Sequence, residues 1–229
     1  MTVTAVVCSF WEPRFANVER IVNDLQHGTA VPDRILILNN NPTAPHRFDH
    51  FRGPQVSVIG GDNMECRGKF VAALFHPAHH YLLADDDTSV GPRTLECLLR
   101  HAKPGFVTGY WGVRLTDRSF MNGQLIFPSV VPAPTKVDAF HGRVIFMAHD
   151  ALVRMLAAEE TVRLADPEAA YVGDDILAGL ANPGSMIIPM RGDETFVDLD
   201  QHGVAMQTRP GYFADRDRFT AAAVTALAS

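Results

Sequence analysis

The sequence has few cysteines, no long apolar run and no excess of basic residues, and each shortage excludes a class of protein. Its three cysteines, Cys8, Cys66 and Cys97, stand far apart without a CxxC pair, so neither a disulfide framework nor a cysteine-based zinc site is expected. No apolar run reaches the roughly 20 residues that a membrane-spanning helix requires. The net charge of −6 argues against a nucleic-acid-binding protein. We therefore expect a soluble, cytoplasmic protein that binds no nucleic acid and does not span a membrane.

The pattern of apolar residues along the 229-residue chain is typical of one α/β domain. In the first half, short β-rich apolar runs alternate with stretches whose apolar residues recur at helical spacing. Parallel neighbouring strands need crossover helices, so this alternation predicts a doubly wound, mainly parallel sheet. The expected strands are Thr4–Cys8, Ile35–Leu38, Val56–Ile59 and Tyr81–Ala84, and the expected helices are Ala16–Leu25, Gly68–Phe75 and Arg93–His101.

The second half of the chain is less regular. Phe106–Tyr110 and Val144–Met147 have the composition of strands, and Asp150–Ala158 and Arg216–Leu227 have that of helices. Between the two strands lies Trp111–Lys136, a long stretch with several prolines in which we expect no regular structure. Irregular segments of this length are uncommon without a role, so we expect this one to help bind a ligand.

Polar residues follow each of the first four expected strands at the point where the strand ends. In doubly wound sheets, ligands bind beyond the carboxyl ends of the strands. The four polar segments should therefore line one crevice, and Ser9 is a candidate ligand contact in the first of them. The segments are Ser9–Arg14, Asn39–Asn41, Gly61–Arg67 and Asp85–Asp87.

Three consecutive carboxylates, Asp85, Asp86 and Asp87, directly follow an apolar strand. Like charges held together raise one another's pKa values, and a divalent cation removes that cost. Hard oxygen ligands suit Mg²⁺ or Mn²⁺, which typically join protein carboxylates to substrate phosphates. The alternative is a solvated acidic turn, because short motifs are weak signals. His202, which lies next to a glycine, is a candidate third metal ligand or, alternatively, a surface histidine.

Asp174 and Asp175 form a second acidic pair, at the start of a short helix expected at Asp174–Leu180. Acids favour helix N-termini, but capping needs only one of the two. The other is a candidate base, nucleophile or electrostatic stabiliser. Arg14 and Arg67 follow strands in polar loops, where a guanidinium could bind a phosphate or a base edge; a solvated arginine is the alternative.

Three motifs, taken in order, resemble a known family. The letters NNNP at 39–42, DDDT at 85–88 and GDDIL at 173–177 are similar in order and spacing to the exostosin-type glycosyltransferase domain, glycosyltransferase family 64. Shorter similarities between these motifs extend the resemblance over most of the chain. It implies the GT-A fold, in which a Rossmann-like, mixed but mainly parallel sheet is flanked by helices in a single domain.

The resemblance also implies a role for each matching residue. The family transfers a sugar from a nucleotide-sugar donor with retention of anomeric configuration and uses Mn²⁺ or a similar ion. We accordingly expect residues 1–110 to bind the nucleotide-sugar and residues 111–229 to bind the acceptor. By this correspondence Arg14, Asn39, Asn63 and Arg67 contact the nucleotide, Asp85 and Asp86 touch its ribose and sugar, Asp87 binds the metal, and Asp174, Asp175 and Arg216 are catalytic. Asp85 is a second candidate metal ligand, because alternate residues at a strand end can face the same side as Asp87.

The sequence leaves several alternatives open. The DDDTS sequence at 85–89, with Thr108 and with Lys103 or Lys136, approximates the motifs of a haloacid-dehalogenase-type phosphatase. A sugar-1-phosphate nucleotidyltransferase is less favoured, because the first strand is not followed by a glycine-rich loop. A non-catalytic nucleotide-sugar-binding domain is also open. The donor is expected to be a UDP-sugar, or else a GDP-sugar, the acceptor a carbohydrate or small molecule, and a homo-oligomer is not excluded.

Overall fold

A computed structural model of the chain describes residues 1–166, 172–199 and 210–228. Within these ranges the strands are β1 Val3–Ser9, β2 Arg34–Asn39, β3 Val56–Gly60, β4 His80–Asp85, β5 Thr88–Val90, β6 Phe106–Thr116, β7 Ser119–Ile126, β8 Thr135–Lys136, β9 Ala139–Ala148, β10 Gly184–Ile187 and β11 Phe196–Asp198. The α-helices are α1 Phe15–His27, α2 Gly68–Ala73, α3 Thr94–His101, α4 His149–Ala165, α5 Asp174–Leu180 and α6 Tyr212–Leu227.

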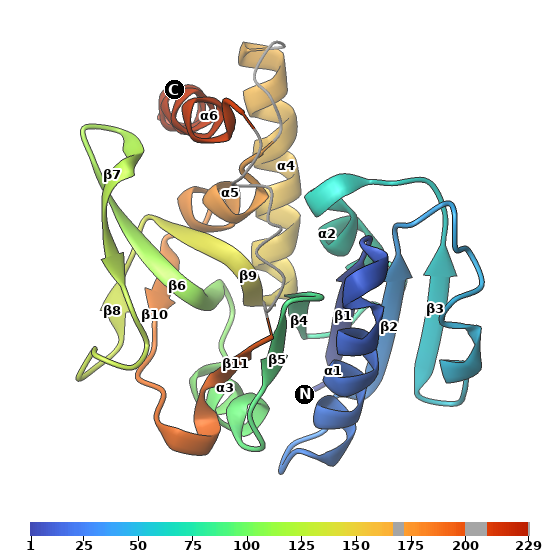
Figure 1. The fold of residues 1–229 in the computed structure, drawn as a ribbon. Coiled ribbons are helices and arrows are strands. Elements are labelled where there is room, and N and C mark those ends of the chain that lie inside the picture. Colours follow the sequence, from blue (N-terminus) through green and yellow to red (C-terminus); the bar gives the residue numbers. More distant parts are fainter. Residues whose placement is uncertain (167–171, 200–209, 229) are drawn as a thin grey trace.

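One sheet runs through the described part of the molecule, in the order β3-β2-β1-β4-β9-β6-β10-β8, with β7 added beside β6 (Figure 1). Strands β1 to β4 are parallel to one another. Strand β9 is antiparallel to both of its neighbours, β4 and β6, and β10 is parallel to β6. The sheet is therefore mixed but mainly parallel, and the fold class predicted from the sequence is confirmed.

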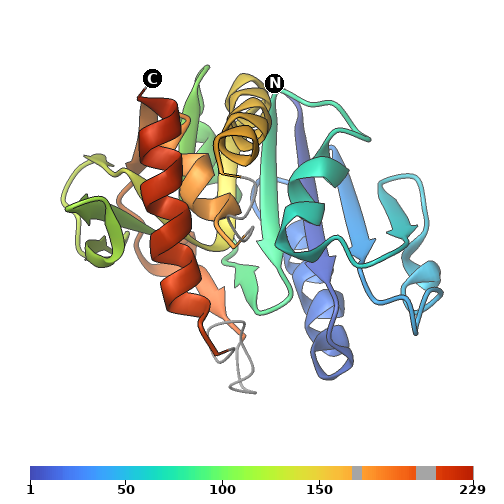
Figure 2. The ribbon, with the colours of Figure 1, turned by 90° about the horizontal axis from the view of Figure 1, so that it is seen from above.

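The parallel half has this structure because β1, β2 and β4 are apolar on both sides. All seven residues of β1 are buried. Along the strand, Val6 packs into the core that contains Phe70 of α2, whereas Val7 packs into the core that contains Val18 of α1. Helices consequently cover both faces of the sheet (Figures 1 and 2). A strand buried on both faces reads as a continuous apolar run, which is why the sequence predicted this half well.

The expectation that Trp111–Lys136 lacks regular structure is wrong. Strand β6 continues to Thr116, turns through Asp117 and Arg118, and returns as β7. Both turn residues have positive φ angles, 52° and 60°, as a two-residue hairpin turn of the primed type requires. Asp-Arg is an unusual sequence for such a turn, so the sequence did not predict the hairpin.

The loops that follow β1, β2, β3 and β4 all leave the sheet at the same edge, because the four strands are parallel. Strand β9 extends the sheet beside β4 in the opposite direction. Helix α5 packs against β9 and brings its N-terminus to the same edge as those loops. Within the described residues, no helix is long and apolar enough to cross a membrane.

Candidate functional site

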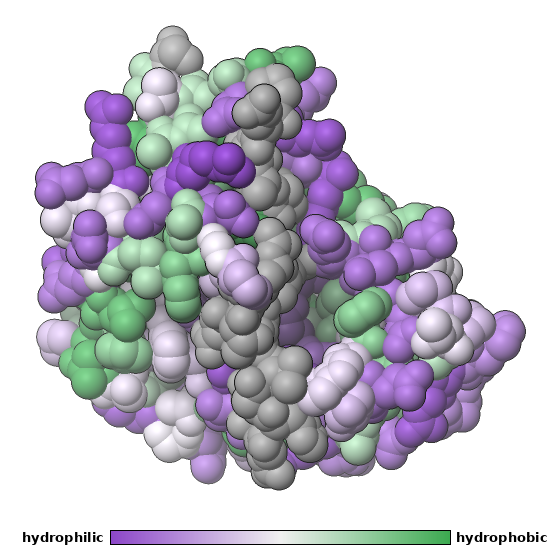
Figure 3. Space-filling model, turned by 45° about the horizontal axis from the view of Figure 1, so that its top comes forward, coloured by the Kyte–Doolittle hydropathy of each residue, from purple (hydrophilic) through white to green (hydrophobic). Residues whose placement is uncertain are grey.

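A cavity of about 480 Å³ opens at the carboxyl ends of the parallel strands. Figure 3 shows this face of the molecule hollowed between its two halves. All four polar segments that the sequence predicted to line one crevice contribute to it. The lining residues are Cys8, Phe10, Trp11, Arg14, Asn40, Asn63, Glu65, Lys69, Asp85, Asp86 and Asp87 from the parallel half, and His141, Gly142, Arg143, Val172, Asp174, Asp175, Tyr212 and Arg216 from the opposite wall.

The central carboxylate of the aspartate cluster, Asp86, fixes the loop that follows β1. Its Oδ2 atom accepts a hydrogen bond of 2.7 Å from the Ser9 hydroxyl and one of 3.4 Å from the backbone N–H of Phe10. Its Oδ1 atom lies 3.5 Å from a guanidinium nitrogen of Arg14. Burial raises the pKa of Asp86, and these partners oppose the increase. Ser9 thus positions Asp86 and is not among the residues that line the cavity.

Asp87 lies between two arginines. Its Oδ2 atom is 3.5 Å from Arg14 and 3.7 Å from the Nε of Arg143 on β9. Arg143 also forms a 2.8 Å ion pair with Asp198 at the end of β11. The backbone of Leu199 donates a hydrogen bond to the Asp87 carbonyl, which joins the end of β11 to the aspartate cluster. Two guanidinium groups thus lie at the point where the sequence predicts a metal and a diphosphate.

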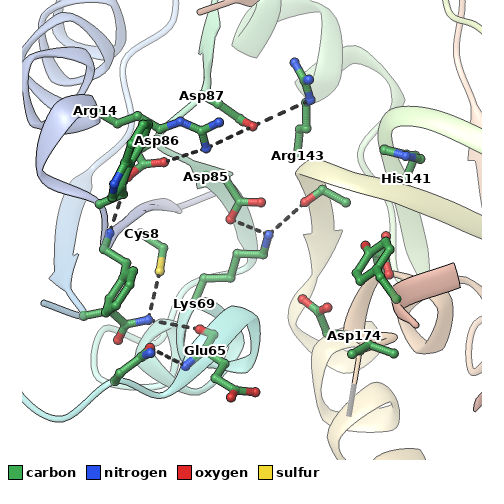
Figure 4. Close-up of a pocket in the computed structure, with 18 of the residues that line it drawn as sticks. Cys8, Arg14, Glu65, Lys69, Asp85, Asp86, Asp87, His141, Arg143 and Asp174 are labelled. Carbon is green, nitrogen blue, oxygen red and sulfur yellow. Dashed lines mark hydrogen bonds and ion pairs between the residues drawn. The ribbon is translucent and has the colours of Figure 1, made fainter. Parts of the chain in front are cut away.

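Asp85 is held by a buried lysine that the sequence analysis missed. The Lys69 side chain is 1% exposed, and its ammonium group donates to Asp85 Oδ1 at 2.7 Å and to the Gly142 carbonyl at 2.9 Å. Burial raises the pKa of Asp85 to about 7, although Lys69 opposes the increase. Lys69 therefore joins the two walls of the cavity (Figure 4). The available signal was a lysine on the apolar face of the expected helix Gly68–Phe75.

The two aspartates at the start of α5 have different surroundings. Asp175 forms a bidentate ion pair with Arg216 of α6, at 3.0 and 2.9 Å, and both side chains are buried. Arg216 also donates to the Val172 carbonyl, and its guanidinium lies 4.1 Å from the centre of the Phe120 ring. The Arg216 guanidinium is thereby held by Asp175, and this buried ion pair joins α6 to α5 in the wall of the cavity.

Asp174 has no such partner. Its Oδ2 atom is buried and accepts no hydrogen bond within the described residues. Burial raises the pKa of Asp174 to about 6, with the neighbouring Asp175 adding to the increase and Lys69 opposing it. In Figure 4 the Asp174 carboxylate lies across the cavity from the aspartate cluster, on the far side of the Lys69 ammonium group. Of the two aspartates on this wall, Asp174 is therefore the one with a carboxylate oxygen available to bind a ligand.

Three residues that the sequence proposed for the site lie elsewhere or cannot be placed. The Asn39 amide closes the turn after β2, donating to the Ala44 carbonyl and accepting from the backbone of Asn41, and it does not line the cavity. The Arg67 Nε lies 3.1 Å from a carboxylate oxygen of Glu159 on α4, outside the cavity lining. His202 lies outside the described residues. Asn63 lines the cavity and is exposed.

The chemistry of the cavity fits a divalent cation only in combination with a phosphate ligand. Among the described residues, no group of three or more His, Cys, Asp or Glu side chains is arranged as a metal site. Asp85 and Asp87 both line the cavity and offer hard oxygen atoms. Mg²⁺, and Mn²⁺ with the same hard ligands, is commonly held by one or two carboxylates together with substrate phosphates and water. A diphosphate would complete such a site.

The phosphatase alternative requires residues that the cavity lacks. Thr108, which would supply the second motif, is buried in β6 and does not line the cavity. Neither Lys103 nor Lys136 is among the lining residues. The lysine that does reach the aspartates, Lys69, precedes them in the chain. The geometry therefore disfavours the phosphatase.

Comparisons with known proteins agree with the fold. No protein-family model matches the chain, and no curated protein matches its sequence. Among solved structures, the chain resembles the mannosyltransferase PcManGT from Pyrobaculum calidifontis, in complex with GDP-Man and Mn²⁺, with a TM-score of 0.56 and 14% identity over 99% of this chain and 72% of that chain. It also resembles S. aureus TarS in complex with UDP-GlcNAc, with a TM-score of 0.64 and 12% identity over 97% of this chain and 66% of that chain.

At these identities the likeness concerns the fold alone. It confirms the GT-A-type architecture that the sequence predicted. Membership of the exostosin family in particular stays a prediction, as do the roles of individual residues.

Proposed function

We propose that this protein is a glycosyltransferase that moves a sugar from a nucleotide-sugar donor to a hydroxyl group of a carbohydrate or small-molecule acceptor. The observation that carries the proposal is a single cavity with Asp85–Asp87 on one wall and Asp174, Asp175 and Arg216 on the other. The resemblance to the exostosin family favours a UDP-sugar and retention of configuration, with a GDP-sugar as the alternative. Residues 1–110 would bind the donor, and residues 111–229 the acceptor.

The part of the cavity around Asp87 is suited to a diphosphate, with Arg14 on the Asp85–Asp87 wall and Arg143 on the opposite wall. Arg14 and Arg143 both reach Asp87 across gaps of 3.5 and 3.7 Å, so either can turn from that carboxylate towards a phosphate. A Mn²⁺ or Mg²⁺ ion held by Asp87 and Asp85 would supply further positive charge to the departing diphosphate. Fixed cations at that position stabilise the negative charge that develops as the bond to the sugar breaks.

The opposite wall is suited to the reacting carbon. In the transfer, the bond between the sugar and the diphosphate breaks with its electron pair on the phosphate oxygen. A bond then forms to the acceptor oxygen, and the proton of that hydroxyl passes to the departing diphosphate. Asp174 has a free carboxylate oxygen in the cavity and is the better placed of the two aspartates to stabilise the cationic sugar or act as a transient nucleophile. Asp175, held by Arg216, positions the start of α5.

The first test is a thermal-shift panel of nucleotides and nucleotide sugars with and without Mn²⁺. A ligand that binds the native state raises the melting temperature by mass action. We expect a Mn²⁺-dependent shift with UDP or GDP, its loss in Asp87→Asn, and its retention in Asp117→Asn. The second variant makes the same change in charge at the β6–β7 turn, outside the cavity lining, where asparagine tolerates the positive φ angle.

The second test is donor consumption in the presence of candidate acceptors. Hydrolysis or transfer that is lost in Asp174→Asn supports the enzyme. Nucleotide binding without consumption of any donor would support the non-catalytic alternative. A response to fluoroberyllate but to no nucleotide would overturn the transferase and restore the phosphatase.

A further inference from the structure

The cavity contains, away from the aspartate cluster, an acidic side chain in an unusual backbone conformation. Glu65 lines the cavity and has a φ angle of 53°. Outside the β6–β7 turn, it is the one described residue other than glycine with a positive φ angle. A side chain in this region costs free energy and persists where its surroundings hold it. Figure 4 shows the Glu65 carboxylate beyond Lys69, away from Asp85–Asp87.

One buried and one exposed asparagine amide, Asn40 and Asn63, hold Glu65 in place. The Asn40 side chain, which is 2% exposed, donates a 3.0 Å hydrogen bond to the Glu65 carbonyl. The backbone N–H of Glu65 donates a 2.8 Å bond to the side chain of Asn63. Within the described residues, no hydrogen bond or ion pair engages the Glu65 carboxylate itself, in contrast to Asp86 and Asp175. The loop is thus fixed while its carboxylate stays available.

The position of Glu65 matches the base of a bound donor. The diphosphate belongs at Asp87 and the sugar on the side of Asp174, as argued above. The nucleoside must then extend in the other direction, over the ends of β1, β2 and β3, where nucleotides bind in doubly wound sheets. Glu65 follows β3, and Phe10, which follows β1, also lines the cavity, with 48% of its surface exposed. An aromatic ring with an open face suits stacking on a base.

A carboxylate distinguishes the bases by their hydrogen-bond donors. It can only accept hydrogen bonds, and it does so best from two parallel N–H groups. Guanine presents two adjacent donors, N1–H and the 2-amino group. Uracil presents one N–H between two carbonyl oxygens, which repel a carboxylate, and adenine and cytosine place an acceptor nitrogen beside their amino group. Guanine is therefore the base that complements Glu65.

We propose that Glu65 binds the Watson–Crick edge of guanine and that the donor is a GDP-sugar. The proposal rests on the proposed function and replaces the UDP-sugar that the sequence resemblance favours. Phe10 contributes stacking that any base can use. Asn40 acts through Glu65 by fixing its backbone and is a positioning residue.

The test is calorimetric titration of the full chain with GDP, IDP and UDP at one Mn²⁺ concentration. IDP differs from GDP by the absence of the 2-amino group, so the pair isolates one of the two hydrogen bonds. We expect GDP to bind at least about tenfold more tightly than IDP, the scale of one hydrogen bond to a charged group, and UDP to bind more weakly still. In Glu65→Gln the difference between GDP and IDP should largely disappear. In Phe10→Ala all three affinities should fall by similar factors.

The outcomes separate this proposal from the proposed function. UDP binding as tightly as GDP, or a GDP preference unchanged in Glu65→Gln, would overturn the guanine assignment and leave the transferase standing. An equal loss for all three nucleotides in Glu65→Gln would also overturn it, because a contact to the ribose or a change in the loop would explain that result. Binding of none of the three would instead overturn the proposed function. Melting temperatures of both variants check that they are folded.

Discussion

Replacing each of the two neighbouring aspartates of α5 by asparagine should have opposite effects on stability. Asp174 is buried, one of its oxygens lacks a hydrogen-bond partner, and its pKa is raised from 3.8 to about 6. A carboxyl whose pKa is higher in the folded state stabilises the fold while protonated, and this contribution is lost as the pH rises through about 6. Asparagine has no charge to lose. Asp174→Asn should therefore stabilise the protein at pH 8 and have little effect near pH 4.

The magnitude follows from the cost of the buried charge. Two pKa units correspond to roughly 3 kcal/mol. The asparagine amide would still lack a buried partner, and that penalty of about 1–2 kcal/mol leaves a net gain of roughly 1–2 kcal/mol. For a chain of this size, each 1 kcal/mol changes the melting temperature by about 2–4 °C. We expect Asp174→Asn to raise the melting temperature at pH 8 by about 2–8 °C while abolishing transfer. Enzymes commonly show this opposition between stability and activity.

Asp175→Asn is the matched control. It leaves the buried guanidinium of Arg216 without its countercharge, and breaking a buried ion pair costs about 3–5 kcal/mol. Its melting temperature should fall at both pH values. The assay is differential scanning fluorimetry of both variants and the wild type at pH 4.5 and pH 8. A lower melting temperature for Asp174→Asn at pH 8, or a gain that is equal at the two pH values, would refute the reasoning.

Three further changes test other parts of the site and core. Lys69→Met should destabilise the protein by about 3–5 kcal/mol in urea titration, because it leaves Asp85 and its neighbours without a buried cation; Lys69→Arg should lose less. Gly142→Ala should displace Asp175 of α5, because a methyl group at residue 142 would lie 2.8 Å from that side chain. We expect this variant to lose turnover while it still binds the nucleotide. Burial lowers the pKa of His80, so its stabilising contribution is present above about pH 6.5 and is lost as the pH falls. His80→Gln should therefore show a smaller decrease in melting temperature between pH 8 and pH 5.

The sequence predicted the parallel half of the fold because its signals are local. Each of the first four strands is a continuous apolar run that ends in polar residues, and the parallel arrangement follows from the helices between them. The position of Asp85–Asp87 at one such end was enough to locate the cavity. Interactions between distant segments gave no comparable signal. The β6–β7 hairpin depends on an Asp-Arg turn. The strand order β4-β9-β6 depends on long-range pairing, which the spacing of apolar residues along the chain does not predict.

The limits of prediction at the site have the same physical origin. A lysine in a helix is normally solvated, so the position of Lys69 on the apolar face of its helix was too weak a signal to predict burial between two walls. Arg67 was expected at the nucleotide because it lies in the polar loop, but the structure directs it towards Glu159 on α4. Likewise, sequence alone could not separate Asp174 from Asp175. Only the partner supplied by α6 distinguishes them.

The central place of β9 has a consequence for the way the chain can fold as it is synthesised. Strand β4 pairs with β1 on one side, but its other neighbour is β9, which begins at Ala139. At about 5–20 residues per second, the ribosome needs on the order of several seconds to supply that strand. Until then β4 presents an unpaired edge, and such edges readily join other chains. The parallel half of the sheet is thus fully synthesised well before its β4 edge is covered. Its completion depends on β9, the strand that also brings His141, Gly142 and Arg143 to the cavity.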